Sequence, residues 1–422
     1  MDTSPQPSHP THTPAALGGI MIIAGTSIGA GMFSLPMMSA GVWFSWTTAL
    51  LLVVAFFLYS SGLYLCEVAF KFPLGAHYTT MATKTLGQKG HIITLLCVGF
   101  VCYILTYAYI SGASSVIRHT FEQLDWIQIS SGEASALFAL LLGMVVFLGT
   151  KYVDKITTAM LGGMIFTFFS SFTGLTQNIE TEKLFPLIPI SDSYIYIGSM
   201  LPVLVVSFGF HTAVPSLIKH FNADTTKVLK SIRYGLFITI AVYLCWIFSV
   251  FGLVTQVQMV EVMHQGGNIG QLIQLLQQLS DSVNLDLLIQ IFSELAIASS
   301  FLGVSLGLFD FIADLFKLSD HPLDRIKTAC ITFLPPTLLG IYAPNGYLIA
   351  MGYAALIAAM FLVVLPCLMA IKARKDPSLI QSQGAQFKVK GGSIRLYFTL
   401  IFGCIVILCE MLHISHILPV YA

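Results

Sequence analysis

The sequence is poor in charge and has no pattern of paired cysteines. Only 9% of its 422 residues are Asp, Glu, Lys or Arg, whereas soluble domains use about 25%. The eight cysteines lie in or beside apolar runs, without paired spacing or a histidine partner pattern, and we expect them to pack as small apolar residues. These shortages exclude a soluble domain and predict neither a disulfide framework nor a metal site.

Motifs of enzymes and channels are also absent. The chain has no H-E-x-x-H sequence, no paired intramembrane aspartates and no nucleophile elbow, so we expect neither an enzyme nor a cofactor. No repeat could form a ring-shaped selectivity filter, and nothing points to a nucleic-acid partner. Residues 1–16 carry no Lys or Arg ahead of the first apolar run, which is too long for a signal peptide. They are expected to form a retained, disordered, cytoplasmic tail.

Long apolar runs account for most of the chain. With 56% hydrophobic residues and a mean hydropathy of +0.83, the composition is typical of an all-α polytopic membrane protein in a lipid bilayer. A spanning helix needs about 20 apolar residues. The segments predicted to span the membrane are eleven: 17–43, 44–70, 90–119, 134–150, 155–176, 194–219, 228–255, 285–315, 326–342, 345–371 and 395–418.

The basic residues alternate with these segments. If the N-terminus is cytoplasmic, the loops after even-numbered segments hold nearly all of the 20 Lys and Arg residues, and only Arg118 and Lys183 fall on the other side. Positive charge gathers on the cytoplasmic side of membrane proteins, so we predict a cytoplasmic N-terminus and a periplasmic C-terminus. The longest external loop, about 256–284, has apolar residues at helical spacing between glutamines. This pattern predicts an amphipathic helix that serves as a lid or as an interfacial anchor.

One stretch of the first segment combines glycines with polar residues. From Gly18 to Pro36 it reads G-G-I-M-I-I-A-G-T-S-I-G-A-G-M-F-S-L-P, with Gly25, Gly29 and Gly31 within seven positions. Glycine costs about 1 kcal/mol per helical position relative to alanine, so the cluster predicts an interrupted helix. Broken backbone at membrane depth is tolerated only where it lines a cavity or is buried in protein. The break is therefore a binding site or, alternatively, a surface for close helix packing.

The sixth segment has a second interruption. It reads L-P-V-L-V-V-S-F-G-F-H-T-A-V-P-S-L, with Gly209 in its middle and Pro215 six residues further on. Proline removes a backbone donor and kinks a helix. Broken segments at positions one and six indicate an inverted repeat with a substrate site between the breaks, and they make packing alone the weaker explanation.

Several motifs follow one another in an order that is typical of one family. Besides the two broken segments, they are Y-I-L-T-Y-A-Y-I-S at 103–111, A-S-S-F-L-G-V-S-L-G-L-F-D at 298–310 and A-P-N-G-Y at 343–347. Through most of its length after residue 17 the chain resembles the bacterial aromatic amino-acid permeases, the hydroxy/aromatic amino acid permease family. The resemblance implies a leucine-transporter-like fold. Two inverted repeats of five helices, 17–176 and 194–371, would precede an eleventh span at 395–418.

The resemblance also implies a function. Such a protein imports an aromatic amino acid, here expected to be tryptophan, across the bacterial cell inner membrane by alternating access and symport with a cation, usually the proton. Two alternatives remain: a tyrosine or broader aromatic permease with sodium coupling, and a transporter-like amino-acid sensor. Some proton-coupled relatives place a lysine in the fifth span. This chain has Met164 and no lysine in the interior of that span, which leaves the coupling ion open.

An amino acid needs three kinds of group in its site. The carboxylate suits the free N–H groups that begin a half-helix, and the ammonium suits the carbonyl groups that end one. The ring needs apolar walls, for which residues beside Gly209 and one face of the third segment are candidates. Tyr107 could equally be an interhelical tyrosine. The predicted substrate-binding residues are Ala24, Gly25, Thr26, Ser27, Gly29, Ala30, Gly31, Tyr103, Tyr107, Ser207, Phe208, Gly209 and Phe210.

Ionisable groups inside spans are costly and are therefore candidates for function. His211, beside the second break, could bind the coupling proton, or it could stay neutral and stabilise the break by a hydrogen bond across helices. Glu294, roughly 14 Å into the eighth segment at about 1.5 Å per residue, is a second proton candidate. Ser299 and Ser300 align with the cation ligands of sodium-coupled members of the fold.

Overall fold

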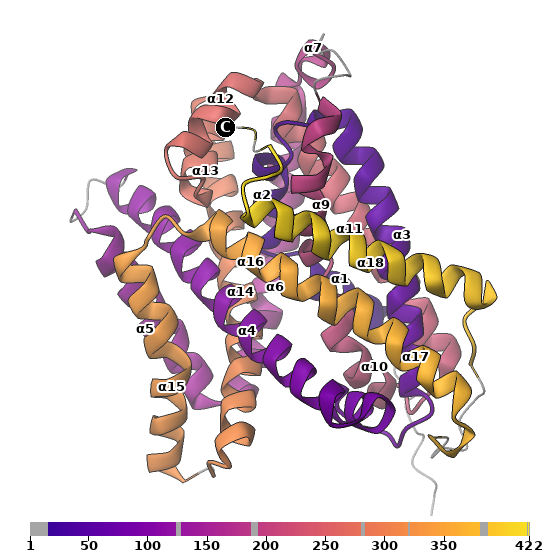
Figure 1. Cartoon of the computed structure of the whole chain (residues 1–422). Coiled ribbons are helices and arrows are strands. Elements are labelled where there is room, and N and C mark those ends of the chain that lie inside the picture. The colour runs from indigo at the N-terminus through magenta and orange to yellow at the C-terminus, as the bar shows by residue number, and fades with distance from the viewer. Residues whose placement is uncertain are drawn as a thin grey trace, which may run out of the picture.

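The structure is a computed structural model that describes residues 16–123, 128–186, 193–279, 283–319, 321–379, 387–419 and 421. The elements of these residues are all helices, which pack into a bundle (Figure 1). The prediction of an all-α fold is confirmed. The tail predicted at 1–16 lies, apart from Ala16, outside the described residues.

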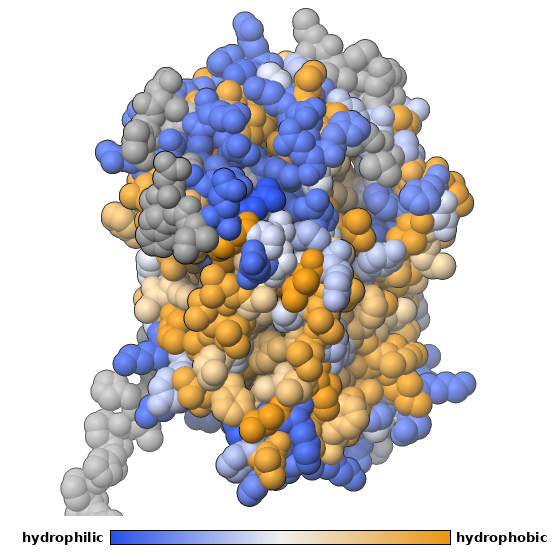
Figure 2. Space-filling view, turned by 90° about the vertical axis from the view of Figure 1, so that its left-hand side faces the viewer, coloured by the Kyte–Doolittle hydropathy of each residue, from blue (hydrophilic) through white to orange (hydrophobic). Residues whose placement is uncertain are grey.

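An apolar belt surrounds the middle of the bundle. Figure 2 shows hydrophobic surface across the centre of one face and hydrophilic surface at the two ends. Leu140, Phe166 and Phe237, each in the middle of a long helix, have exposed side chains. Exposed apolar surface of this extent is unfavourable in water and suits the hydrocarbon layer of a membrane. The chain is therefore a multi-pass membrane protein.

Nine helices of the described chain are long and apolar enough to cross a membrane, or ten if the bent pair α1 and α2 forms one span. The long helices are α3 (Trp43–Ala69), α4 (Tyr78–Gln123), α5 (Ser131–Leu148), α6 (Thr150–Leu175), α11 (Thr225–Leu253), α14 (Val283–Phe316) and α18 (Gly392–Ile414). Of these, α4 is interrupted by a kink at Gly87, whose φ of 71° is not helical. The short connecting helices are η1 (Thr176–Asn178), α7 (Thr181–Leu184), η2 (Tyr194–Tyr196) and η5 (Pro377–Leu379).

One predicted span differs from the rest. The segment 326–342 is helix α15 (Pro322–Tyr342), whose 21 residues have the length of a span. Its first turns carry Asp324, Arg325 and Lys327, so the helix is less apolar than the other spans. The count of eleven spans stays a prediction at this helix.

The tenth predicted span, 345–371, is not a regular helix. It consists of α16 (Tyr347–Ala359), a π-helical turn η4 (Met360–Val364) and α17 (Leu365–Lys375). π-turns are rare and occur frequently at functional sites. Apolar periodicity does not distinguish such a turn from an α-helix, so the sequence did not predict it.

The polar loop at 256–284 forms two helices, α12 (Gln256–His264) and α13 (Ile269–Gln278). The apolar residues of α13, among them Ile269, Leu272 and Leu276, are buried against α4 and α14. In Figure 1 both helices lie at the upper end of the bundle, opposite α10. The predicted amphipathic helix is confirmed, and its role as a lid stays a prediction.

A buried ion pair ties the lower ends of α3 and α17 together. Arg374 Nε and Nη2 donate to the two carboxylate oxygens of Glu67 at 2.6 and 2.7 Å, and the amide of Val389 donates to the same carboxylate at 2.9 Å. The Glu67 side chain is 2% exposed and that of Arg374 is 15% exposed. Such bidentate pairs are geometrically specific, so this pair defines how α17 meets α3.

Replacement of Glu67 by alanine should destabilise the bundle strongly. Breaking a buried pair leaves an uncompensated charge, and we expect a loss of about 3 kcal/mol in the free energy of unfolding in detergent micelles. The control is Glu122→Ala, which removes the exposed Arg118–Glu122 pair, with side chains 46% and 56% exposed. That change should cost less than about 1 kcal/mol. Equal losses in the two variants would contradict a stabilising role of the buried Glu67–Arg374 pair.

Candidate functional site

The first break has the form that its glycines predict. Residues 28–30 separate helix α1 (Ala16–Ser27) from helix α2 (Gly31–Met38). The chain bends by 49° between the two helices. The carbonyl end of α1 and the amide end of α2 therefore meet inside the bundle. The prediction of an interrupted first segment is confirmed.

The second break is confirmed as well. Helix α9 (Ile197–Ser207) is followed by the 3₁₀ turn η3 (Phe210–Ala213) and by α10 (Val214–His220). Gly209, with φ −61° and ψ 37°, leaves helical geometry between them. Helix α9 packs on α2, and η3 packs on α1, so the two breaks lie against each other.

Tyr243 of α11 joins the two breaks. Its hydroxyl oxygen lies 2.7 Å from the carbonyl oxygen of Ser27 and 2.5 Å from that of Ser207, the last residues of α1 and α9. A tyrosine hydroxyl has one proton, so it donates to one of these carbonyls at a time. The other carbonyl then lacks a donor from Tyr243. The expected acceptors for an ammonium group, Ser27 and Ser207, are thus brought together.

The peptide groups of Ala30, in the middle of the first break, are held from both sides. Its amide donates to Ser300 Oγ at 3.0 Å, and its carbonyl accepts from the Tyr347 hydroxyl at 2.7 Å. Ser300 in turn donates to the carbonyl of Ala296 at 2.8 Å. Helices α14 and α16 therefore fix the break through two side chains.

The amides of Gly29 and Gly31 are different. Within the described chain neither donates a hydrogen bond. A Cβ atom on Gly29 would lie 2.2 Å from Ser300 Oγ, whereas one on Gly31 would lie no closer than 3.7 Å to Ser207. Gly29 is therefore required for the close approach of α14. Of the three amides expected to bind a carboxylate, two are unpaired and one is occupied by Ser300.

The remaining predicted substrate residues at the first break are Ala24, Gly25 and Thr26. Ala24 is buried and its carbonyl accepts from Ile28 N at 2.7 Å, which continues the helix by one residue. Thr26 is exposed and bonds back to the carbonyl of Ile22 at 2.6 Å. Gly25 faces the side chain of Leu161. Their place in a binding site stays a prediction.

The two tyrosines of α4 connect helices. Tyr103 donates to the carbonyl of Ile331 at 2.8 Å, and Tyr107 donates to that of Ala343 at 2.7 Å. Both acceptors lie in or directly after α15. This geometry is the interhelical alternative for Tyr107, and their role as a wall of the site stays a prediction. Phe208 and Phe210, by contrast, are fully buried beside Gly209.

Two further ion candidates, Glu294 and Ser299, lie on α14, and no hydrogen bond of the described chain joins either to the two breaks. The Glu294 carboxylate accepts from Thr120 Oγ1 at 2.8 Å, near the upper end of α4. Ser299 donates to the carbonyl of Ala296 at 3.1 Å. Of the ion candidates, Ser300 lies at the first break and His211 at the second, whereas Glu294 bonds to Thr120 of α4 instead.

Sequence reasoning missed Tyr243 and Tyr347. Each shares its apolar span with a second tyrosine, Tyr234 or Tyr353, and 16 tyrosines occur in the chain. The one available signal is that a buried tyrosine hydroxyl usually finds a partner. That rule does not say which of many carbonyl groups the partner is.

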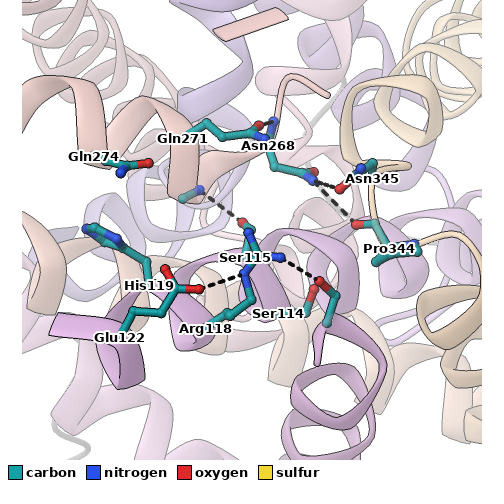
Figure 3. A pocket seen from close by; sticks show the side chains of 12 residues that line it. Ser114, Ser115, Arg118, His119, Glu122, Asn268, Gln271, Gln274, Pro344 and Asn345 are labelled. Carbon is teal, nitrogen blue, oxygen red and sulfur yellow. Dashed lines mark hydrogen bonds and ion pairs between the residues drawn. The ribbon is translucent and has the colours of Figure 1, made fainter. Parts of the chain in front are cut away.

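A polar pocket lies between α4, α13 and the residues before α16 (Figure 3). Its volume of about 30 Å³ holds water but not an amino acid. The Gly270 amide donates to Ser115 Oγ at 2.9 Å, and Asn268 Nδ2 donates to Asn345 Oδ1 at 2.7 Å. These bonds join α13 to α4 and to the residues before α16. The lining residues are Ser114, Ser115, Arg118, His119, Glu122, Ser131, Asn268, Gly270, Gln271, Gln274, Pro344 and Asn345.

These features define a class: a polytopic helical membrane protein whose two interrupted spans meet at buried polar groups inside the bundle. Comparison with known proteins gives the particular family. The model of the tryptophan/tyrosine permease family matches residues 12–410. The chain therefore belongs to the tryptophan/tyrosine permease family, and as a permease it is not an enzyme.

Relatives with known names align along nearly the whole chain. It is 40% identical to the tryptophan-specific transport protein of Pseudomonas aeruginosa (strain UCBPP-PA14), over 100% of both chains. It is 35% identical to the low affinity tryptophan permease of Escherichia coli (strain K12), over 96% of this chain and 97% of that one. It is 34% identical to the tyrosine permease of Enterobacter agglomerans, over 97% of this chain and 99% of that one. The family predicted from the motifs is confirmed.

Replacement of Gly29 by alanine should disrupt the first break. The new methyl group overlaps Ser300 Oγ, and overpacking of this kind costs about 1–3 kcal/mol, so the melting temperature in detergent should fall. The control is Gly18→Ala, because a Cβ at Gly18 meets nothing within 4 Å. That change should be neutral or stabilising. The double variant Gly29→Ala/Ser300→Ala removes the overlap and should recover part of the loss, and no recovery would contradict this packing.

Proposed function

We propose that this chain is a secondary transporter that imports an aromatic amino acid, tryptophan in the first place, together with a proton across the bacterial inner membrane. The observation that carries the proposal is the junction at Tyr243, where the carbonyl ends of two broken helices meet beside two amides that have no partner among the described residues. The names of the relatives support the choice of substrate. The N-terminus lies in the cytoplasm in this proposal, and the C-terminus lies in the periplasm.

The junction has complementary groups for both charges of an amino acid. The amides of Gly29 and Gly31 begin α2 and offer N–H groups to a carboxylate. The carbonyls of Ser27 and Ser207 share the single proton of Tyr243, so one of them can accept from an ammonium group. Each charge then replaces a missing backbone partner, which stabilises the bound state in a medium without water.

Aromatic side chains surround the same region. Phe33 of α2, two residues after Gly31, lies with its ring centre 5.4 Å from that of Trp246 and 5.7 Å from that of Phe292. Trp246 lies one turn after Tyr243, and its buried Nε1 has no hydrogen-bond partner among the described residues. Rings at these distances interact favourably in edge-to-face or tilted geometry. Such a cluster favours an aromatic ring over an aliphatic side chain and supports an aromatic substrate.

Alternating access requires that the two ends of the site open in turn. The hydrogen bonds from Gly270 to Ser115 and from Asn268 to Asn345 hold α13 at the upper end of the bundle, which we assign to the periplasm. We propose that α13 is a lid and that a five-plus-five inverted repeat moves around the junction. A sodium-coupled permease of broader aromatic range and an amino-acid sensor with the same site are the competing functions.

Transport by the purified protein in proteoliposomes tests the function. Labelled tryptophan should accumulate when the outside is more acidic than the inside, and a sodium gradient at equal pH should not support accumulation. Unlabelled tyrosine should compete less well than tryptophan, and leucine should not compete. Saturable binding without any uptake would favour the sensor. Uptake driven by sodium alone would favour the other coupling ion.

Substrate analogues test the two charges of the site separately. Tryptamine lacks the carboxylate and indole-3-propionate lacks the ammonium group, so each leaves one set of backbone groups unpaired. An unpaired buried polar group costs about 1–3 kcal/mol, so each analogue should compete with labelled tryptophan about 10–100-fold more weakly than unlabelled tryptophan does. If either analogue competed as well as unlabelled tryptophan does, the backbone groups assigned to the charge that it lacks would not bind the substrate.

A further inference from the structure

His211 is buried at the second break with one ring nitrogen engaged and the other unpaired. Its Nε2 lies 2.7 Å from Ser61 Oγ of α3. Its Nδ1 is buried and has no hydrogen-bond partner among the described residues. The ring stacks on that of Phe210 at 4.4 Å between centres. An orphaned polar atom inside a membrane protein is costly and therefore calls for an explanation.

The π-helical turn η4 favours one tautomer of His211. Ser61 Oγ lies 2.7 Å from the carbonyl of Leu362 in η4 and 3.2 Å from the carbonyl of Leu58, and both carbonyls only accept. A Ser61 proton donated to His211 instead would put the ring proton on Nδ1, which has no acceptor among the described residues. We therefore assign the Ser61 proton to one of the carbonyls and the proton of the neutral imidazole to Nε2, which donates to Ser61. Nδ1 consequently carries a free lone pair.

The π-turn itself is anchored at this point. Ser61 donates to Leu362, and the Tyr78 hydroxyl donates to the carbonyl of the preceding residue, Phe361, at 2.7 Å. Side chains of α3 and α4 therefore donate to two successive carbonyl groups of the π-turn. The irregular backbone of the tenth span is therefore coupled to His211 through one hydroxyl group.

Within the part of the chain that the structure describes, His211 bonds to no ionisable group. The elements packed on η3 are α1, α3 and α10, and α1 has no ionisable side chain. Glu67, on α3, is engaged by Arg374. No hydrogen bond or ion pair joins His211 to any ionisable residue of the described chain. The ionisable residues of α3 and α10 and of α17, which continues η4, are Tyr59, Tyr64, Cys66, Glu67, Lys219, His220, Cys367, Lys372, Arg374 and Lys375.

We propose that His211 Nδ1 binds the coupling proton and that Ser61, oriented by the carbonyl groups of η4 and α3, is the positioning residue that keeps this nitrogen free. This inference rests on the proposed function and deepens it by assigning the proton to one atom. Binding transfers a proton from water to the Nδ1 lone pair and gives an imidazolium with Nε2–H still donated to Ser61. Glu294, Ser299 and Ser300 then take no part in proton binding.

His211→Gln tests the proton site, because glutamine can donate to Ser61 but cannot take up a proton. Two assays in proteoliposomes are compared. Counterflow exchanges labelled tryptophan for trapped tryptophan and requires no net proton movement. Accumulation driven by an imposed pH gradient requires the proton. One proton per substrate supports about tenfold accumulation per pH unit of gradient, since one pH unit is a factor of ten in proton activity.

The variant should lose the gradient-driven accumulation and keep counterflow within about threefold of wild type, a small change on the scale of mutational effects. Accumulation equal to that of wild type would overturn the proposal. Loss of both activities in a variant with a normal melting temperature would also overturn it, since the proton site would not be separable from substrate binding. Absence of counterflow in the wild-type protein would contradict the proposed function instead.

Ser61 variants test the positioning role by a pH profile. Ser61→Ala removes the acceptor of Nε2–H, which destabilises the imidazolium more than the neutral ring, because the neutral ring can shift its proton. The midpoint of the pH dependence of uptake should therefore move about one unit or more to lower pH, given the strength of a charge-assisted hydrogen bond. Ser61→Thr keeps the hydroxyl and should restore the midpoint.

The matched control is Ser60→Ala. Ser60 is the adjacent residue of α3 and is equally buried, but it accepts from Arg395 at 2.7 and 3.0 Å and does not contact His211. Its pH midpoint should equal that of wild type. An unchanged midpoint in Ser61→Ala, or an equal shift in Ser60→Ala, would overturn the positioning role even if transport itself is normal.

Discussion

The structure depends on one constraint: backbone that leaves helical geometry inside the membrane must find its hydrogen bonds within the protein. Both interrupted spans meet this requirement through side chains of other helices. Tyr243 serves the carbonyl ends of α1 and α9, and Tyr347 and Ser300 hold the peptide groups of Ala30. Among the described residues the amides of Gly29 and Gly31 stay unpaired, and the proposed function assigns them to the ligand.

The same constraint accounts for the π-turn. Its displaced carbonyls accept from Ser61 and Tyr78, and the first of these donors also orients His211. In three irregular stretches of backbone, in the first, sixth and tenth predicted spans, carbonyl groups thus accept hydrogen bonds from side chains of other helices. Fold stability and the candidate site share one set of hydrogen bonds, so the site is more rigid than its glycines alone would indicate.

Much of the architecture could be predicted from local sequence. Apolar runs of sufficient length predicted the helices, and clustered glycines and Pro215 predicted the two breaks, because both signals act within one or two helical turns. The amphipathic α13 followed from the spacing of its leucines and isoleucines. Helix α15 was harder, since charges in its first turns dilute its apolar character, and η4 was missed because a π-turn needs no distinctive residue.

By itself the sequence determined that this chain is a helical membrane protein, where two of its spans are broken, and to which permease family it belongs. Only the tertiary structure decided which side chains complete those breaks. Tyr243 and Ser27 are 216 positions apart, and Ala30 and Tyr347 are 317 apart. Such pairings depend on how helices pack across the bundle, and periodicity along one helix contains no information about the partner that a hydroxyl group will meet.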